Sequence, residues 1–231
     1  MGGVEAMIGI GEDLKDTGIR IAYTVIEDFH VHESSTRLLE AINDIVSKFR
    51  ASFKNVEGLA ENNNIRSYRR FFWRMKLDPT KWRPSPEALA RRVLRGSSLP
   101  SINNIVDAAN ASSLWNLVSI GLYDLDKVEE PLYLDRAKPG DSFEPIGRGR
   151  VLVPPGVLVL RDSRGVILHV YAHRDSRISM VTGETRRILA IAYGVPGLRG
   201  LEESLVYMIN ILGDAGETVN ASIRDIMVEG V

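Results

Sequence analysis

The first part of the chain alternates apolar and polar positions in a way that predicts a strand followed by a helix. Residues Ile19 to Ile26 are apolar and rich in β-branched side chains, which is typical of a strand. Ser34 or Ser35 can then cap a helix. The apolar face of that helix recurs at helical spacing and consists of Leu38, Leu39, Ile42, Ile45, Val46 and Phe49.

A second helix is predicted after the polar break at residues 61–64. One face of this helix is apolar and consists of Tyr68, Phe71, Phe72 and Met75. Arg66, Arg70 and Arg74 lie four residues apart on another face, and the helix ends before Pro79. Because the aromatic side chains lie opposite the arginines, we interpret them as core residues and not as a platform for stacking bases.

Two more helices are predicted before the pattern changes. The run Pro84-Ser85-Pro86-Glu87 is typical of a helix start, with Ser85 as the N-cap, and this helix continues to Gly96. The next helix begins after Pro100 and spans roughly residues 101–118.

The remainder of the chain predicts a sheet followed by helices. Short apolar runs separated by Gly and Pro predict strands at Leu132 to Ala137, Arg150 to Val153, Val157 to Leu160 and Val166 to Tyr171. Helical spacing returns at Thr182 to Tyr193 and Leu201 to Leu212, and Val219 to Met227 predicts a last short helix. We therefore expect an α+β fold, a mixed sheet packed with helices, forming one compact unit over residues 1–231.

Composition limits the chemistry that the chain can carry. The sequence contains no cysteine, which excludes disulfides, thiolate nucleophiles and Cys-rich zinc or iron–sulfur sites. His30 and His32 have no second pair of ligands at a metal-binding spacing, so neither a metal nor a cofactor is expected. No apolar run is long enough to cross a membrane, and a cytoplasmic location is expected.

Positive charge is concentrated in one segment. Residues 66–95 contain ten basic and two acidic residues, a local net charge of +8 in a chain whose net charge is −1. Such clustering favours contact with phosphates, and the alternative is an ordinary solvated helix surface. The residues predicted to contact RNA are Arg66, Arg70, Arg74, Arg83, Arg91, Arg92 and Arg95.

The most informative segment is Leu99 to Asp126, with the sequence LPSINNIVDAANASSLWNLVSIGLYDLD. It resembles the B-three/B-four module of the phenylalanyl-tRNA synthetase beta subunit, in which a helix opening N-N-V-V-D-x-x-N leads to a P-x-H-A-F-D-L-D strand. The positions that match without a gap are Asn103, Asn104, Asp107, Asn110, Tyr123, Asp124 and Asp126. A looser resemblance extends over residues 66–195 and includes a V-T-x-E-T helix start at Val181 to Thr185.

The resemblance implies a fold like that of the synthetase editing domain, contact with tRNA, and hydrolysis of a wrongly attached amino acid. The chain lacks an aminoacylation domain, so it is predicted to be a trans-acting hydrolase of mischarged aminoacyl-tRNA and not itself a synthetase. Two alternatives remain open. The chain can bind tRNA or another RNA without catalysis, or it can bind an amino acid or another small molecule.

Three positions depart from the family pattern. The family histidine falls on Gly121, the family proline falls on Ser119, and the glutamate that recognises the tyrosine hydroxyl falls near Met180. A site without that buried acceptor loses its discrimination for a hydroxyl group. Specificity for tyrosine is therefore not expected here.

Replacement catalytic groups are sought in the polar cluster at residues 173–177. His173 can orient or activate a water with Asp175 as its partner, Ser176 is a further catalytic candidate, and Arg174 or Arg177 can hold a carboxylate or phosphate. The alternative is a polar turn after a strand, and His169 inside that strand is interpreted as structural. The predicted substrate pocket consists of Asn103, Asn104, Asp107, Gly121, Arg174 and Met180. Its Asn and Asp residues have the alternative role of capping helices.

Overall fold

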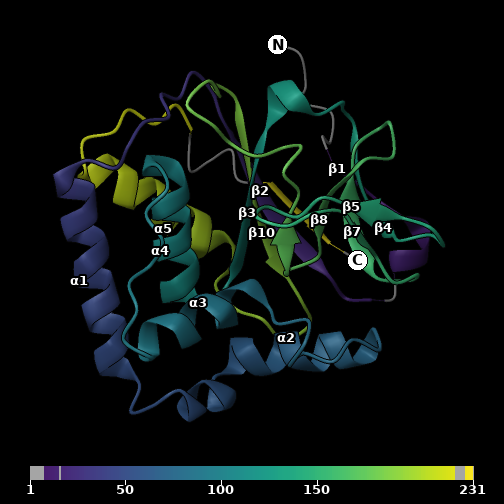
Figure 1. The fold of residues 1–231 in the computed structure, drawn as a ribbon, viewed down its shortest axis with the longest axis horizontal. Helices are drawn as coiled ribbons and strands as arrows, with labels where there is room; N and C mark the ends of the chain where they lie inside the picture. Colours follow the sequence, from purple (N-terminus) through teal and green to yellow (C-terminus); the bar gives the residue numbers. More distant parts are fainter. Residues whose placement is uncertain (1–7, 16, 222–226, 231) are drawn as a thin grey trace.

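The computed structural model describes residues 8–15, 17–221 and 227–230 and has the predicted α+β fold (Figure 1). Its helices are α1 (Thr36–Ser52), α2 (Asn63–Arg74), α3 (Ser85–Leu94), α4 (Asn104–Asn116) and α5 (Leu201–Asp214). Short 3-10 helices occur at Glu12–Leu14, Glu57–Glu61 and Leu125–Lys127. No helix in the described part of the chain is long and apolar enough to cross a membrane.

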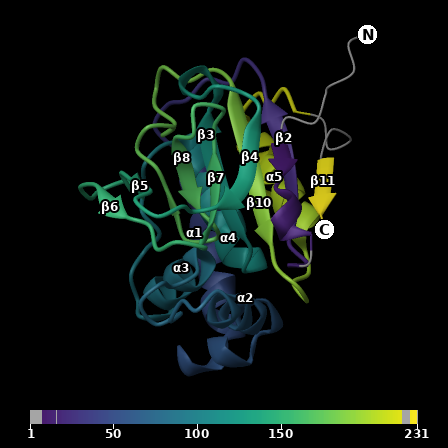
Figure 2. The same ribbon diagram turned by 90° about the vertical axis from the view of Figure 1, so that its right-hand side faces the viewer.

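The strands form two main sheets. A four-stranded antiparallel sheet has the order β11 (Met227–Gly230), β2 (Arg20–Ile26), β10 (Ile188–Gly194) and β3 (Ser119–Asp124). A five-stranded mixed sheet has the order β1 (Ile8–Ile10), β4 (Leu132–Arg136), β7 (Leu158–Arg161), β8 (Ile167–Val170) and β9 (Arg174–Asp175). The pair β5 (Ser142–Phe143) and β6 (Val151–Leu152) forms a hairpin that projects from the body of the molecule (Figure 2).

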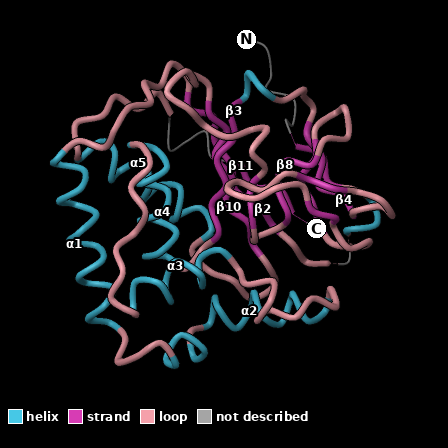
Figure 3. The backbone as a smooth tube through the Cα atoms, viewed as in Figure 1, coloured by secondary structure: helices cyan, strands magenta, loops and turns pink. Residues whose placement is uncertain are grey.

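The central strand β10 is buried on both faces, which places the four-stranded sheet in the middle of three layers. Alternate residues of β10 point to opposite faces: Ile188, Ala190 and Ala192 pack with the helices, whereas Leu189 and Ile191 pack with the five-stranded sheet. Helices α1, α4 and α5 lie on one side and the second sheet on the other (Figure 3). Because both faces of β10 exclude water, every one of its residues is buried.

Local sequence signals explain where the helices begin. The Ser35 side chain accepts a hydrogen bond from the Leu38 amide and caps α1, as predicted. Asn62 caps α2 in the same way, and the aromatic face of α2 is buried, as predicted. The Tyr68 hydroxyl donates to the Tyr193 carbonyl and accepts from the Ser119 amide, so this residue ties α2 to two strands.

Two local predictions were wrong, and a third lies largely outside the described residues. Ser85 is the first residue of α3 and not its cap, because its hydroxyl is hydrogen bonded to that of Ser119. Thr182 to Tyr193 is not a helix: residues 182–185 form a turn that is closed by hydrogen bonds between Thr182 and Thr185, and β10 follows. The Thr185 hydroxyl also donates to Asp124, which anchors the turn to β3. The last predicted helix lies partly outside the described residues, at 222–226, and Met227 begins a strand.

Candidate functional site

Three neighbouring cavities meet at β9, the edge strand of the five-stranded sheet. The outer cavity, about 220 Å³, is lined by Lys81, Trp82, Phe143, Pro145, Arg148, Val151, Leu152, His173 and Arg174. The central cavity, about 340 Å³, is lined by Ser85, Ala88, Leu89, Arg92, Pro100, Asn110, Ser113, Ile120, His169, His173 and Asp175. The inner cavity, about 80 Å³, includes Asn110, Ile120, Asp175 and Met180. His173 thus lines both of the first two cavities, and Asp175, Asn110 and Ile120 line both of the last two.

His173 is held in one tautomer by its surroundings. Its Nδ1 lies 2.8 Å from the Arg83 carbonyl oxygen, which can only accept, so Nδ1 carries the proton and Nε2 keeps a lone pair. The ring also packs on Trp82, with ring centroids 5.1 Å apart. Burial lowers the pKa of His173 to about 4, against the opposing effect of the Arg83 carbonyl. The imidazole is therefore neutral at pH 7 and can accept a hydrogen bond from water at Nε2.

This lowered pKa predicts that His173 makes the folded state sensitive to acid. The unfolded chain takes up a proton near the ordinary pKa of 6.5, whereas the folded chain takes it up only near pH 4. The stability contributed by neutral His173 is thus complete above pH 6.5 and decreases by roughly 3 kcal/mol as the pH falls to about 4.

Urea unfolding at several pH values checks this expectation in His173→Gln, which cannot take up the proton. The free energy of unfolding of this variant should depend less on pH than that of the wild type between pH 4 and 6.5. His30→Gln, which changes an exposed histidine, is the matched control and should keep the wild-type dependence. Parallel curves for the wild type and His173→Gln would contradict the assignment.

Asp175 is bound by residues other than His173. Its carboxylate accepts a hydrogen bond from the Tyr123 hydroxyl at 2.9 Å and lies 2.8 Å from Nδ1 of His169. Tyr123 is joined in turn to the Tyr193 hydroxyl at 2.6 Å, and the His169 ring stacks on Tyr193 with centroids 4.3 Å apart. Among the described residues no hydrogen bond joins Asp175 to His173, so the structure does not contain the expected pair.

His169 is the cavity residue whose position the sequence interpretation missed. It was interpreted as structural because it lies inside a strand, yet β8 and β9 pair it directly with Asp175. Its Nε2 is buried and has no hydrogen-bond partner among the described residues. The signal that could have revealed this residue is the short hairpin around residues 171–173, which brings positions 169 and 175 opposite each other.

The departures from the family pattern have local structural explanations. A Cβ at Gly121 would lie 2.2 Å from the Tyr123 hydroxyl oxygen and 3.0 Å from a carboxylate oxygen of Asp175. The space that a histidine would need at this position is therefore occupied. Ser119 stands where the family has proline, and its amide donates to the Tyr68 hydroxyl, a bond that proline cannot make.

The predicted Asn and Asp pocket residues do not line any of the three cavities. Asn103 caps α4, and Asn104 is bonded to the backbone of residues 30 and 32. Asp107 accepts from the Ser34 and Ser101 hydroxyls and from a backbone amide. Ser176, a catalytic candidate, is buried and bonds to the Glu144 carbonyl outside the three cavities. The geometry of these four residues favours structural roles, whereas Met180 lines the inner cavity.

The arginines predicted to contact RNA differ in their surroundings and fall into three groups. Arg83 and Arg91, together with Arg69, surround the fully buried carboxylate of Glu87 at 2.6–3.8 Å. Arg92 donates to the Ser98 carbonyl and lines the central cavity. Arg92 is itself exposed, and the other exposed residues available to phosphates are Arg66, Arg70 and Arg74 along α2 and Arg95 after α3.

A family model described as the B3/4 domain matches residues 67–205, which confirms the resemblance predicted from the sequence. No curated protein matches. A solved structure that matches is an N-terminal fragment of the phenylalanyl-tRNA synthetase beta subunit from Pyrococcus horikoshii, with 17% identity and a TM-score of 0.49. The match covers 92% of this chain and 49% of the fragment, so the chain spans about half the length of that structure.

Proposed function

Since this chain belongs to the B3/4 domain family, we propose that it associates with tRNA and hydrolyses mischarged aminoacyl-tRNA in trans. The central cavity is the proposed site of hydrolysis. The observation that carries the proposal is the position of His173 inside the matched segment: it is neutral, its Nε2 has no hydrogen-bond partner among the described residues, and it lines two neighbouring cavities. The family's synthetase module supplies the expected substrate class, an amino acid esterified to tRNA.

The reaction requires little from the protein because an aminoacyl ester is already activated. A water oxygen attacks the ester carbonyl carbon and forms a bond to it, and the bond from that carbon to the ribose oxygen breaks. The ribose oxygen takes up a proton released by the attacking water, so the products are the free amino acid and the ribose hydroxyl of the tRNA. His173 Nε2 can orient the attacking water, and with a pKa of about 4 it contributes more by positioning than by removing a proton. Arg92 and the Asn110 amide also line the cavity and can donate to the developing oxyanion.

The exposed arginines of α2 form the proposed binding surface for the tRNA backbone. Arg66, Arg70 and Arg74 follow one another at single-turn intervals and are exposed. Neutralising phosphates with such a row releases counterions, so the affinity should fall as salt rises. The ion pairs around Glu87 leave Arg83 and Arg91 less available for the same purpose.

Ester hydrolysis on a panel of tRNAs charged with radiolabelled amino acids, both correct and incorrect, tests the proposal. We expect one class of mischarged tRNA to be deacylated. His173→Gln should lower kcat/KM by about 100-fold or more, because the water is no longer oriented. His30→Gln is the matched control, since it removes an exposed histidine outside the cavities. No hydrolysis of any charged tRNA would refute the catalytic proposal.

The same hydrolysis assay distinguishes residues that bind the tRNA from residues that act in catalysis. Reversing the charge at Arg66, Arg70 and Arg74 together should raise KM and leave kcat near the wild-type value, because these side chains lie outside the cavities. An unchanged KM would show that α2 does not contact the substrate.

A second candidate function is tRNA binding without turnover. It is favoured by the engagement of Asp175 with Tyr123 and His169, which leaves His173 without a carboxylate partner. This function predicts that charged tRNA is retained in a filter-binding assay and never deacylated. The third alternative, a small-molecule binder that does not contact RNA, predicts no retention of tRNA at all.

A further inference from the structure

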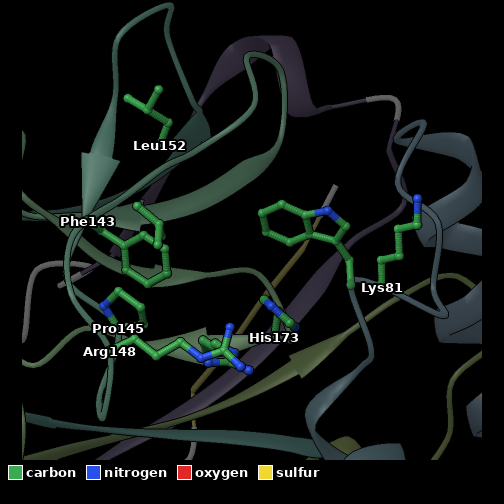
Figure 4. A pocket seen from close by; sticks show the side chains of 9 residues that line it. Lys81, Phe143, Pro145, Arg148, Leu152 and His173 are labelled. Atoms are coloured by element: carbon green, nitrogen blue, oxygen red, sulfur yellow. The ribbon is translucent and has the colours of Figure 1, made fainter.

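The outer cavity differs from the central cavity in the side chains that line it. One wall is apolar and includes Phe143 and Leu152, which come from the β5–β6 hairpin. Figure 4 shows Lys81 on the opposite side and the Arg148 side chain extending toward His173. Trp82 also lines the cavity, and its ring already packs on His173. The cavity therefore combines aromatic surface with several cationic groups.

Two guanidinium groups in this cavity lack negative partners. Within the described residues, the side chains of Arg148 and Arg174 form no hydrogen bond and no ion pair. Burial and the charge of Arg148 lower the pKa of Arg174, which indicates that the two like charges lie close together. Nearby arginines are paired, since Arg150 and Arg177 both bind Glu144. Two unpaired cations at a cavity are an incomplete site for an anion.

The volume of the cavity limits the size of the ligand. About 220 Å³ is below the range of roughly 300–1,000 Å³ of sites for drug-sized molecules, so a ligand no larger than a single nucleotide is appropriate. A nucleobase stacks well on aromatic side chains, and a phosphate matches the fork of a guanidinium group. A nucleoside phosphate carries both groups in one molecule.

We infer that the outer cavity is a nucleotide subsite, in which a base packs against Trp82 and a phosphate is bound by Arg148 and Arg174. Its biological setting rests on the proposed function: a nucleotide near the aminoacylated end of tRNA would lie here, and the ester would pass His173 into the central cavity. His173 lines both cavities, so the two groups of one substrate can lie on either side of its ring.

Trp82 itself provides the readout. Trp73 and Trp115 are both exposed, so Trp73→Phe and Trp115→Phe together leave Trp82 as the single tryptophan at little expected cost to folding. Titration with AMP should quench the fluorescence of Trp82 saturably. Inorganic phosphate should bind about tenfold more weakly or worse, because it gains no stacking. A short single-stranded RNA ending in a 3′ adenosine tests whether an RNA end is preferred to a free nucleotide.

Substitutions then show which residues bind the phosphate of the ligand and which bind its base. Arg148→Ser and Arg174→Ser should each weaken AMP binding by about tenfold or more and change adenosine binding little. Arg37→Ser, an exposed arginine of α1 outside the cavity, is the matched control and should leave both unchanged. Trp82→Leu, followed by calorimetry, should abolish the preference for AMP over phosphate.

The outcomes distinguish this inference from the proposed function. Equal quenching by phosphate and AMP, or AMP affinity unaffected by both arginine substitutions, would overturn the nucleotide subsite even if deacylation were observed. Saturable AMP binding that depends on Arg148 and Trp82 would support the subsite even if no charged tRNA were hydrolysed.

Discussion

Replacing Glu87 by glutamine is expected to lower the free energy of unfolding by about 3–5 kcal/mol, because it removes the negative charge at the centre of three arginines. The Glu87 side chain is fully buried and binds Arg69 through two hydrogen bonds, at 2.6 and 2.9 Å. Arg83 and Arg91 lie within 3.8 Å of the same carboxylate. Glutamine has nearly the same shape, so the loss measures charge and not packing.

Urea unfolding at neutral pH checks this prediction. Glu40→Gln, which removes an exposed carboxylate from α1, is the control and should change the free energy of unfolding by less than about 0.5 kcal/mol. If Glu87→Gln were as mild as this control, the three arginines would not depend on Glu87 for compensation. The ion pairs would then contribute little to holding α2 against α3.

The elements that could be predicted from sequence are those with one face in water. Helices α1 and α2 have one buried and one exposed face, and their residues recur accordingly. Strand β10 is different, because both of its faces are covered and its sequence Ile-Leu-Ala-Ile-Ala-Tyr-Gly has no polar positions to reveal a period of two. Without that alternation a buried strand and a buried helix look alike, and the helix prediction was wrong for this physical reason.

The candidate site was predictable as a segment but not as a set of contacts. Residues 173–175 were selected because a polar cluster follows an apolar strand, and these residues do line the cavities. The partner of Asp175 depends instead on strand pairing, which places His169 opposite it. A count of charges likewise could not show that Arg69 binds Glu87, because that contact requires α2 and α3 to be packed together. Arg83 and Arg91 each lie four residues from Glu87, and that spacing was a signal present in the sequence.

Introducing a side chain at Gly121 is the second change expected to have a large effect. Gly121→Ala should lower the free energy of unfolding by about 2–3 kcal/mol, because the new methyl group would lie 2.2 Å from the Tyr123 hydroxyl oxygen in a fully buried site. Gly121→His, which restores the family residue, should be worse, since Asp175 also blocks the space. Restoring that histidine alone is therefore not expected to improve hydrolysis.

Substitutions at Gly121 and Tyr123 should be coupled energetically if the Tyr123 side chain occupies the space of the family histidine. Tyr123→Leu removes both the hydroxyl and the ring carbon that lies 2.8 Å from the added Cβ, so Gly121→Ala should cost less in that background than in the wild type. A double-mutant cycle measured by urea unfolding gives the coupling directly. Residues in contact typically deviate from additivity by about 0.5–3 kcal/mol. Additive effects would mean that a residue other than Tyr123 occupies the space for a side chain at position 121. Strong coupling would show that Tyr123 fills the space that the histidine occupies in the family.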